Sequence, residues 1–248
     1  MITIVMLNWR RPKYVEINVA QYFAYRLVSE ILIFSNTGLP LDFTFLPKQP
    51  TVISATTDLG LYTRFTTAVL GHNECVMHVD DDLLIPEATV NRLYSAWCEN
   101  RQVCHSLHGR KVTNGYVREN VYGHVEVVLT RCLMVTRDLC AHALTHVHHF
   151  DDLTCEPYGN GEDIILSFTA LKRSGQLNRA YHLPYDNHPG YADGESGQDT
   201  LSIHKRWNGH EEHRSRLVNR CRAYFGIQAG IVAAQDEHQG HFVETQPK

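Results

Sequence analysis

Continuous apolar runs alternate with amphipathic segments along the first hundred residues of the chain. The runs are rich in β-branched residues, which is typical of strands buried on both faces of a parallel sheet. They are ITIVML (2–7), EILIFSN (30–36), PTVISA (50–55) and ECVMHV (74–79). Apolar residues with helical spacing follow at about 12–25, 57–70 and 86–98, with Pro12 and Pro86 at first helical positions. This alternation predicts an α/β fold, with a mostly parallel sheet and helices on both of its faces.

The second half of the chain has shorter apolar runs. Strands are predicted within 103–112, 124–130 and 132–138, and helices at about 137–145, 161–173 and 209–225. A loop rich in Gly, Asp, Pro and His runs from Pro184 to Gln198, and residues 233–248 are expected to form a loose tail. We therefore expect a single domain over 1–248. Its nucleotide-binding half would cover about 1–100, and about 101–226 would bind a second substrate.

Composition and charge narrow the classes of partner. The 248 residues include 23 basic and 27 acidic side chains, so the net charge of -4 provides no basic surface for nucleic acid. No apolar run approaches the roughly 20 residues of a transmembrane helix. The charges near the N-terminus follow the first apolar run, so we expect a strand there rather than a signal peptide. The seven cysteines form no C-x-x-C pair, which favours small core residues in a cytoplasmic protein.

Three consecutive aspartates follow the fourth apolar run in VMHVDDDLLIPEATVNRL, residues 76–93. Adjacent carboxylates repel one another and are costly to bury alone, so we expect a metal ion, a basic side chain or both beside them. If the chain stays extended, Asp80 and Asp82 point to one side and Asp81 to the other. Two carboxylates on one side suit a hard divalent cation. The alternative is an acidic turn that caps the following helix.

The aspartates are expected to share a crevice with the ends of other strands, because ligands of open α/β sheets bind beyond the carboxyl ends of the strands. The segments that would meet there are Asn8 to Arg11, Asn36, the loop at 56–60 and Asp80 to Asp82. Arginine suits phosphate because its planar guanidinium carries a permanent charge and a fork of donors. The candidate phosphate ligands are Arg10, Arg11 and Arg64, each with a solvated surface position as the alternative.

Three further polar segments each have two interpretations. In NGED (160–163) the asparagine suits a helix N-cap, but both acids lie off the apolar stripe of the next helix and could face a cleft. HVHHFDD (146–152) has residues with zinc-ligand chemistry, although loop histidines are favoured because no H-E-x-x-H motif is present. His204, Lys205 and Arg206 form either a solvated basic turn or a cluster that closes over a diphosphate.

Several common catalytic motifs are missing. The sequence contains no G-x-x-x-x-G-K-[ST], no G-x-G-x-x-G after the first strand and no G-x-S-x-G. This argues against P-loop NTPases, dinucleotide oxidoreductases and typical serine hydrolases.

Over about residues 2–226, the order and spacing of six segments resemble the catalytic domain of exostosin-like glycosyltransferases, which have the Rossmann-like GT-A fold. These segments are VMLNWRRP, IFSNTG, VMHVDDDLLI, VVLTRCLMVTRD, NGEDIILSF and HKRWNGHEEHRSRLVNRCRAYFG.

The resemblance implies a UDP-sugar donor and a Mn2+ or Mg2+ cofactor. Asp82 and Asp80 would bind the cation, Asp80 would also reach the ribose, and Asp163 would lie at the sugar and acceptor side. Arg206, or Lys205 in a register shifted by one residue, would stabilise the leaving diphosphate. The other residues expected to contact the nucleotide-sugar are Asn8, Arg11, Asn36, Arg64, Asp81, Asn160 and His204.

The expected activity is metal-dependent transfer of a sugar to a hydroxyl or glycan acceptor, with the retention of configuration that the resemblance implies. The sequence departs from the family pattern at Gly161, where the motif has Cys, and at Ser167, where it has Asn. An Asn contact near Leu59-Gly60 is also missing. We expect neither the membrane anchor nor the upstream domain of animal exostosins. The donor sugar and the acceptor therefore stay open.

Three alternative functions remain at this point. A sugar nucleotidyltransferase could use paired aspartates in a similar sheet, but NWRRP lacks the glycine-rich loop that usually follows its first strand. A non-catalytic UDP-sugar-binding protein would keep the nucleotide residues without transfer. A metal-dependent hydrolase is the third alternative.

Overall fold

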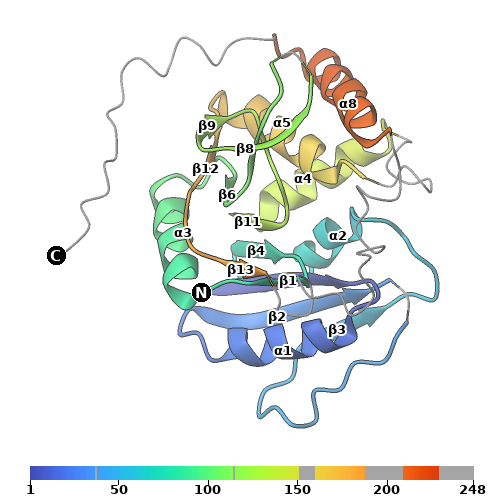
Figure 1. Ribbon diagram of the computed structural model, residues 1–248, viewed down its shortest axis with the longest axis vertical. Helices are drawn as coiled ribbons and strands as arrows, with labels where there is room; N and C mark the ends of the chain where they lie inside the picture. The colour runs from blue at the N-terminus through green and yellow to red at the C-terminus, as the bar shows by residue number, and fades with distance from the viewer. Residues whose placement is uncertain (37, 114, 151–159, 188–208, 229–248) are drawn as a thin grey trace, which may run out of the picture.

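The computed structural model describes residues 1–36, 38–113, 115–150, 160–187 and 209–228 (Figure 1). The centre of the fold is an eight-stranded sheet in the order β3-β2-β1-β4-β11-β6-β12-β9. The strands β3, β2, β1 and β4 are parallel, whereas β11 is antiparallel to both β4 and β6. The bounds are β1 Ile2–Asn8, β2 Val28–Ser35, β3 Thr51–Ser54, β4 Cys75–Val79, β6 His105–Ser106, β9 Gly123–Val125, β11 Cys132–Thr136 and β12 Asn178–Ala180.

Two small sheets and six described helices complete the fold. The small sheets are β10-β7-β8 and β13-β5. Their strands are β5 Leu83–Leu84, β7 Gly109–Lys111, β8 Val117–Val121, β10 Val127–Val128 and β13 Asp186–Asn187. The helices are α1 Pro12–Phe23, α2 Thr63–Val69, α3 Glu87–Glu99, α4 Arg137–Val147, α5 Glu162–Ser174 and α8 His210–Phe225.

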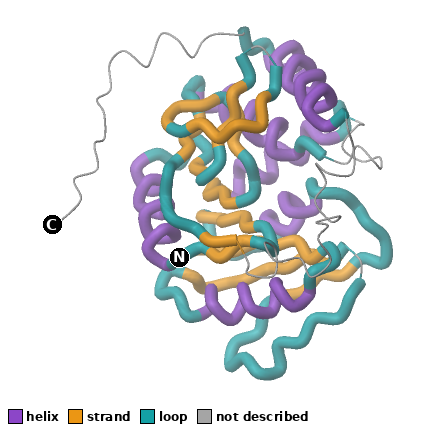
Figure 2. The backbone as a smooth tube through the Cα atoms, in the orientation of Figure 1, coloured by secondary structure: helices purple, strands orange, loops and turns teal. Residues whose placement is uncertain are grey.

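Helices cover both faces of the central sheet (Figures 1 and 2). On β1, Ile4 and Met6 belong to the core formed with α1 and α3, whereas Val5 belongs to the core formed with α2, α4 and α5. Successive side chains of a strand point to opposite faces, so both kinds of position must be apolar here. This explains the uninterrupted run ITIVML. The predicted α/β fold is confirmed, and it is consistent with the GT-A fold.

The elements predicted in the first half are confirmed, with small shifts at their ends. α2 begins at Thr63 rather than near residue 57. Gly60 has a φ of +85°, a conformation that favours glycine and interrupts a helix, so residues 57–62 form a loop. Pro86 precedes α3 as its N-cap instead of occupying the first helical position.

The second half differs more from the prediction. The run 103–112 contains two short strands, β6 and β7, because the Ser106 hydroxyl bonds to the His108 amide and the Leu129 carbonyl between them. The run 124–130 likewise divides into β9 and β10. β8 and β12 were not predicted. β8 has the largely polar and exposed sequence VRENV, and β12 is only three residues long, so neither has the apolar pattern of a strand. The strand predicted at 132–138 ends at Thr136, because the Thr136 hydroxyl caps the helix α4 that follows.

The predicted tail and loop are only partly within the described residues. The tail at 233–248 lies outside them, as does the predicted loop beyond residue 187. The described part of that loop contains β13, which pairs with β5 beside the three aspartates.

The cysteines support the interpretation as small core residues. Cys155 lies outside the described residues, and five of the other six cysteines are buried free thiols: Cys75, Cys104, Cys132, Cys140 and Cys221. Burial raises the pKa of each of these thiols, so they stay protonated. Cys98 is exposed. None of the described helices combines the length and the apolarity needed to cross a membrane.

His105 in β6 is a buried histidine that stays neutral. Its Nδ1 lies 2.9 Å from the Tyr181 hydroxyl and its Nε2 lies 2.6 Å from the Asn100 carbonyl. Burial lowers the pKa of His105 to about 4, although the bond to Asn100 opposes this shift. In an unfolded chain the pKa is about 6.5. Between these values only the unfolded state binds the proton, so stability falls as the pH falls through this window.

Between pH 7 and pH 5, His105 alone is expected to remove about 2 kcal/mol from the free energy of unfolding. His105→Gln keeps a polar side chain that does not titrate, so its loss over the same range should be smaller by about this amount. Urea unfolding of both proteins at the two pH values measures the difference. Equal losses in the two proteins would contradict the assignment of this pH dependence to His105.

Candidate active site

The strand ends that were expected to share a crevice are in contact. The Asn8 side chain at the end of β1 donates to Ser35 Oγ at 3.1 Å, and the Asn36 amide donates to the Asn8 carbonyl at 3.0 Å. Asn36 Oδ1 in turn accepts from the Leu59 amide at 3.1 Å, and Trp9 Nε1 donates to Asp58 at 2.8 Å. The ends of β1 and β2 therefore meet Asp58 and Leu59 of the predicted loop at 56–60, so these segments converge as predicted.

The three aspartates form a turn rather than an extended strand. We call residues 80–82 the acidic turn. The Leu83 amide donates to the Asp80 carbonyl at 3.3 Å, which closes the turn directly after β4. Arg11 Nη1 contacts both Asp81, at 2.9 Å, and Asp82, at 3.4 Å. The alternation of Asp81 and Asp82 to opposite sides was expected only for an extended chain, and this condition is not met because the chain leaves the strand conformation here.

Arginines supply the positive charge that the acidic turn requires. Arg64 Nη2 lies 3.2 Å from Asp80, and Arg131 Nη2 lies 3.6 Å from Asp82 Oδ1, in addition to the two contacts of Arg11. Three carboxylates thus meet three guanidinium groups drawn from distant parts of the sequence. Arg10 differs from the other two predicted phosphate ligands, since its guanidinium lies over the Trp9 ring, 4.2 Å from the ring centroid.

Burial raises the pKa of two aspartates in the acidic turn. It raises the pKa of Asp81 to about 7, although the nearby Arg11 lowers it. It also raises the pKa of Asp82, and the negative charge of Asp80 adds to that rise. Asp82 Oδ1 is buried and has no hydrogen-bond partner among the described residues. An oxygen atom of this kind is available to an additional positive ligand.

The second acidic segment begins α5 but does not cap it through Asn160. The N-cap position is Gly161, whose φ of +124° favours glycine, and no side chain caps the helix. The Asn160 side chain instead accepts a hydrogen bond from Arg214 Nη1 at 2.6 Å. The N-cap interpretation of Asn160 is therefore wrong. A tertiary partner from α8 replaces the local helix contact.

Arg64 joins the acidic turn to this second segment. Its Nε lies 3.4 Å from Glu162 Oε1, while its Nη2 contacts Asp80. Glu162 also accepts a hydrogen bond from the Thr130 hydroxyl at 2.8 Å. Burial raises the pKa of Glu162, and Arg64 opposes that rise. Burial alone would lower the pKa of Arg64, but Asp80 and Glu162 raise it, so the guanidinium stays charged.

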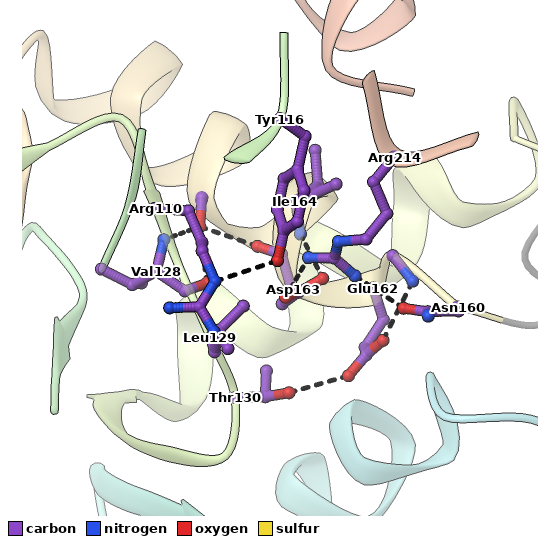
Figure 3. A network of polar contacts seen from close by, with 12 residues as sticks. Arg110, Tyr116, Val128, Leu129, Thr130, Asn160, Glu162, Asp163, Ile164 and Arg214 are labelled. Atoms are coloured by element: carbon purple, nitrogen blue, oxygen red, sulfur yellow. Dashed lines mark hydrogen bonds and ion pairs between the residues drawn. The ribbon is translucent and has the colours of Figure 1, made fainter. Parts of the chain in front are cut away.

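Arg214 of α8 contacts both Asn160 and Asp163 of the second segment (Figure 3). Its Nη2 lies 2.5 Å from Asp163 Oδ2, and its guanidinium packs 4.3 Å from the centroid of the Tyr116 ring. The side chains of Arg214 and Asp163 are only 3% and 5% exposed. Burial would lower the pKa of Arg214, but Asp163 raises it above its usual value. The pair is therefore a buried ion pair inside the candidate site.

Arg214 was not among the predicted site residues, although the sequence contains a signal for it. Arg214, Leu217, Val218 and Cys221 have the i, i+3, i+4, i+7 spacing of one helix face, and the three apolar members are core residues. A charge on the buried stripe of a helix indicates a buried partner. The basic residues predicted for this side of the site, His204, Lys205 and Arg206, lie outside the described residues.

The histidine segment does not form a metal site with described neighbours. His146 lies in the last turn of α4 rather than in a loop, and its Nδ1 contacts the Tyr224 hydroxyl at 3.1 Å. The His149 ring packs on Tyr224 with centroids 4.7 Å apart. Among the residues that the structure describes, no three His, Cys, Asp or Glu side chains are arranged to hold a metal ion by themselves. Asp152 lies outside the described residues.

Comparison with known proteins identifies the family of the chain. Residues 2–233 match the model of the glycosyl transferase family 64 domain. No curated protein matches the sequence. The matched residues include the acidic turn, the segment that begins α5 and the helix that carries Arg214, so the match covers the whole described site. The chain therefore belongs to glycosyl transferase family 64.

Proposed function

We propose that this glycosyltransferase moves a sugar from a UDP-sugar to a hydroxyl group of an acceptor, with Mn2+ or Mg2+ at the acidic turn. One observation carries the proposal. Arg64 contacts both Asp80 of the acidic turn and Glu162 of the second segment, so the proposed cation and diphosphate site would lie next to a buried carboxylate pair. A diphosphate leaving group and the sugar attached to it need these two environments side by side.

The donor side of the proposal rests on the strand ends. Asn8 and Asn36 would contact the nucleoside, and Asp80 the ribose. Arg11 is 16% exposed, and it would exchange its bonds to Asp81 and Asp82 for bonds to the diphosphate. This exchange suits arginine, because phosphate and carboxylate both match the geometry of its donors. His204, with Lys205 or Arg206, remains the further proposed contact to the leaving diphosphate.

The residues of the acidic turn fit a divalent cation. Asp82 Oδ1 is buried without a hydrogen bond, and carboxylate oxygen is the ligand that Mg2+ and Mn2+ prefer. The described residues offer no complete three-ligand site, so diphosphate oxygens and water would fill the remaining positions. When bound, the cation would neutralise charge that develops on the departing UDP.

The acceptor side of the proposal rests on Asp163 and Arg214. Asp163 Oδ2 contacts Arg214 at 2.5 Å, and Asp163 Oδ1 accepts from the Ile164 amide at 2.9 Å. Both carboxylate oxygens are thus engaged. This favours a fixed negative charge beside the oxocarbenium-like sugar over a role as covalent nucleophile. Transfer with retention would then place the acceptor hydroxyl on the same face as the departing UDP.

A calorimetric titration of UDP into the protein, with and without Mn2+, tests the proposal. We expect binding to be about a hundredfold tighter with Mn2+, which corresponds to about 2.7 kcal/mol. A screen of UDP-sugars for transfer and hydrolysis would follow. Absence of UDP binding in both conditions would contradict the donor site. Binding of UDP-sugars without transfer or hydrolysis would instead indicate a binding protein.

A further inference from the structure

Backbone hydrogen bonding holds Arg131 beside the acidic turn. Arg131 immediately precedes β11, in which Cys132 pairs with Val79 at the end of β4. The Arg131 carbonyl accepts a hydrogen bond from the Asp80 amide at 2.9 Å. The backbone position of Arg131 relative to Asp80 is therefore set by the strand pairing, and only its side chain can move.

The Arg131 side chain lies between the acidic turn and β13. Its Nη2 donates to Asn187 Oδ1 at 2.9 Å and lies 3.6 Å from Asp82 Oδ1. The second distance is an ion pair but exceeds a hydrogen bond, in agreement with the unsatisfied state of Asp82 Oδ1. The Arg131 side chain is 25% exposed, whereas that of Asp82 is 10% exposed. The Arg131 side chain is therefore partly exposed to solvent, whereas the carboxylate that it contacts is nearly buried.

Arg131 in its present position would disfavour a cation at Asp82 Oδ1. Arg11 contacts Asp82 Oδ2 at 3.4 Å, so Asp82 Oδ1 is the carboxylate oxygen left for a metal ion. Mg2+–oxygen distances are about 2.0–2.1 Å, so a bound cation would bring a double positive charge close to the Arg131 guanidinium. Like charges this close repel strongly where water is largely excluded.

We propose that Arg131 occupies the place of the divalent cation at Asp82 in the free protein and turns to the diphosphate when cation and nucleotide bind together. This inference rests on the proposed donor site. The partial exposure of the Arg131 side chain gives it room to turn, and a phosphate would offer it two acceptor oxygens. Two consequences follow. The cation alone binds weakly, and each of the two ligands strengthens the binding of the other by the same factor.

The experiment measures Mn2+ binding from the loss of the free-ion electron paramagnetic resonance signal, with and without UDP. It compares the parent protein with Arg131→Ala, and with Arg131→Gln, which keeps a side-chain amide for Asn187 without the charge. Arg101→Ala is the matched control, because Arg101 is an exposed arginine that pairs with Glu74 outside the site. Thermal unfolding monitored by circular dichroism checks that each variant is folded.

Both Arg131 variants are expected to bind Mn2+ alone about tenfold more tightly than the parent protein. Their affinity for UDP in Mn2+ should fall by about tenfold, so that the coupling between the two ligands shrinks. Arg101→Ala should match the parent protein in both measurements. Binding of Mn2+ alone that is no tighter in the variants, or not detectable in any of the proteins, would overturn the inference.

The measurements with and without UDP distinguish a failure of this inference from a failure of the proposed function. An unchanged UDP affinity in the Arg131 variants would overturn the step in which Arg131 turns to the diphosphate. Failure of the parent protein to bind UDP in any condition would contradict the donor site itself. The Mn2+ arm without nucleotide would then still decide whether Arg131 competes with a cation at Asp82.

Discussion

Replacing Arg214 with Ala is expected to lower the free energy of unfolding by about 3–5 kcal/mol and to reduce sugar transfer by about a hundredfold or more. The substitution leaves the Asp163 carboxylate buried without its partner at 2.5 Å, and removes the donor to Asn160 at 2.6 Å. A buried charge without a partner is among the most destabilising results of a single substitution. Urea unfolding measures the first effect and a transfer assay with an active UDP-sugar the second.

A control on the same helix separates the structural part of this effect from the catalytic part. Arg222 of α8 also forms a buried ion pair, with Glu126 at 2.7 Å, and donates to the Val112 carbonyl at 3.0 Å. Arg222→Ala should therefore cost a similar amount of stability. At a temperature where both variants are folded, it should retain transfer, whereas Arg214→Ala should not. Equal activity of the two variants would show that Arg214 has only a structural role.

A conservative replacement gives a second check. Arg214→Lys keeps the positive charge beside Asp163 but cannot also reach Asn160 with a fixed fork of donors. We expect it to recover most of the stability and only part of the transfer activity. Full recovery of both would mean that charge alone matters and that the bond to Asn160 contributes nothing to the reaction.

The strands that are buried on both faces of the central sheet could be predicted from the sequence. β1, β2 and β4 are covered on both faces, so their residues are apolar without interruption and are easily recognised. Once these strands are taken as parallel neighbours, their carboxyl ends must meet. The contacts of Asn8, Asn36 and the loop at 57–62 follow from topology alone.

Local rules failed where a distant residue decides the conformation. Asn160 fits the N-cap rule, but Arg214 lies 54 residues later in the sequence and takes its side chain away from the helix. Alternation along a strand predicts opposite sides for Asp81 and Asp82, but the chain turns after Val79 and Arg11 contacts both. The residues beside Asn160 and Asp81 do not show that these contacts replace the local rule, because both contacts form only after the sheet and helices pack.

The acidic turn illustrates the same limit in electrostatic terms. Three adjacent aspartates require positive charge, and the sequence left open whether a metal ion, a basic side chain or both would provide it. Arg11 was predicted to lie near, but Arg131 was not, since it precedes a strand of the second half that pairs with β4 only in the folded sheet. Basic side chains therefore balance the turn in the free protein, and a cation would have to compete with them.

Replacing Asp82 with Asn is expected to abolish the roughly hundredfold gain in UDP affinity that we predict for Mn2+. Asparagine has nearly the same shape, so Arg11 and Arg131 lose an ion-pair partner without a cavity forming. The amide carries no charge and is a poor substitute for the carboxylate as a cation ligand. Calorimetric titration of UDP with and without Mn2+ gives the affinities, which should become equal in the variant.

The comparison requires a variant that changes the net charge equally at another place. Asp138→Asn serves this purpose, because Asp138 lies on α4 and pairs with Arg173 at the surface. Its UDP affinity should keep the full dependence on Mn2+. If Asp82→Asn also kept that dependence, the cation would have to bind elsewhere, and the three aspartates would be a structural turn whose charge the arginines alone neutralise. The resemblance at VMHVDDDLLI would then reflect a shared fold rather than a shared metal site.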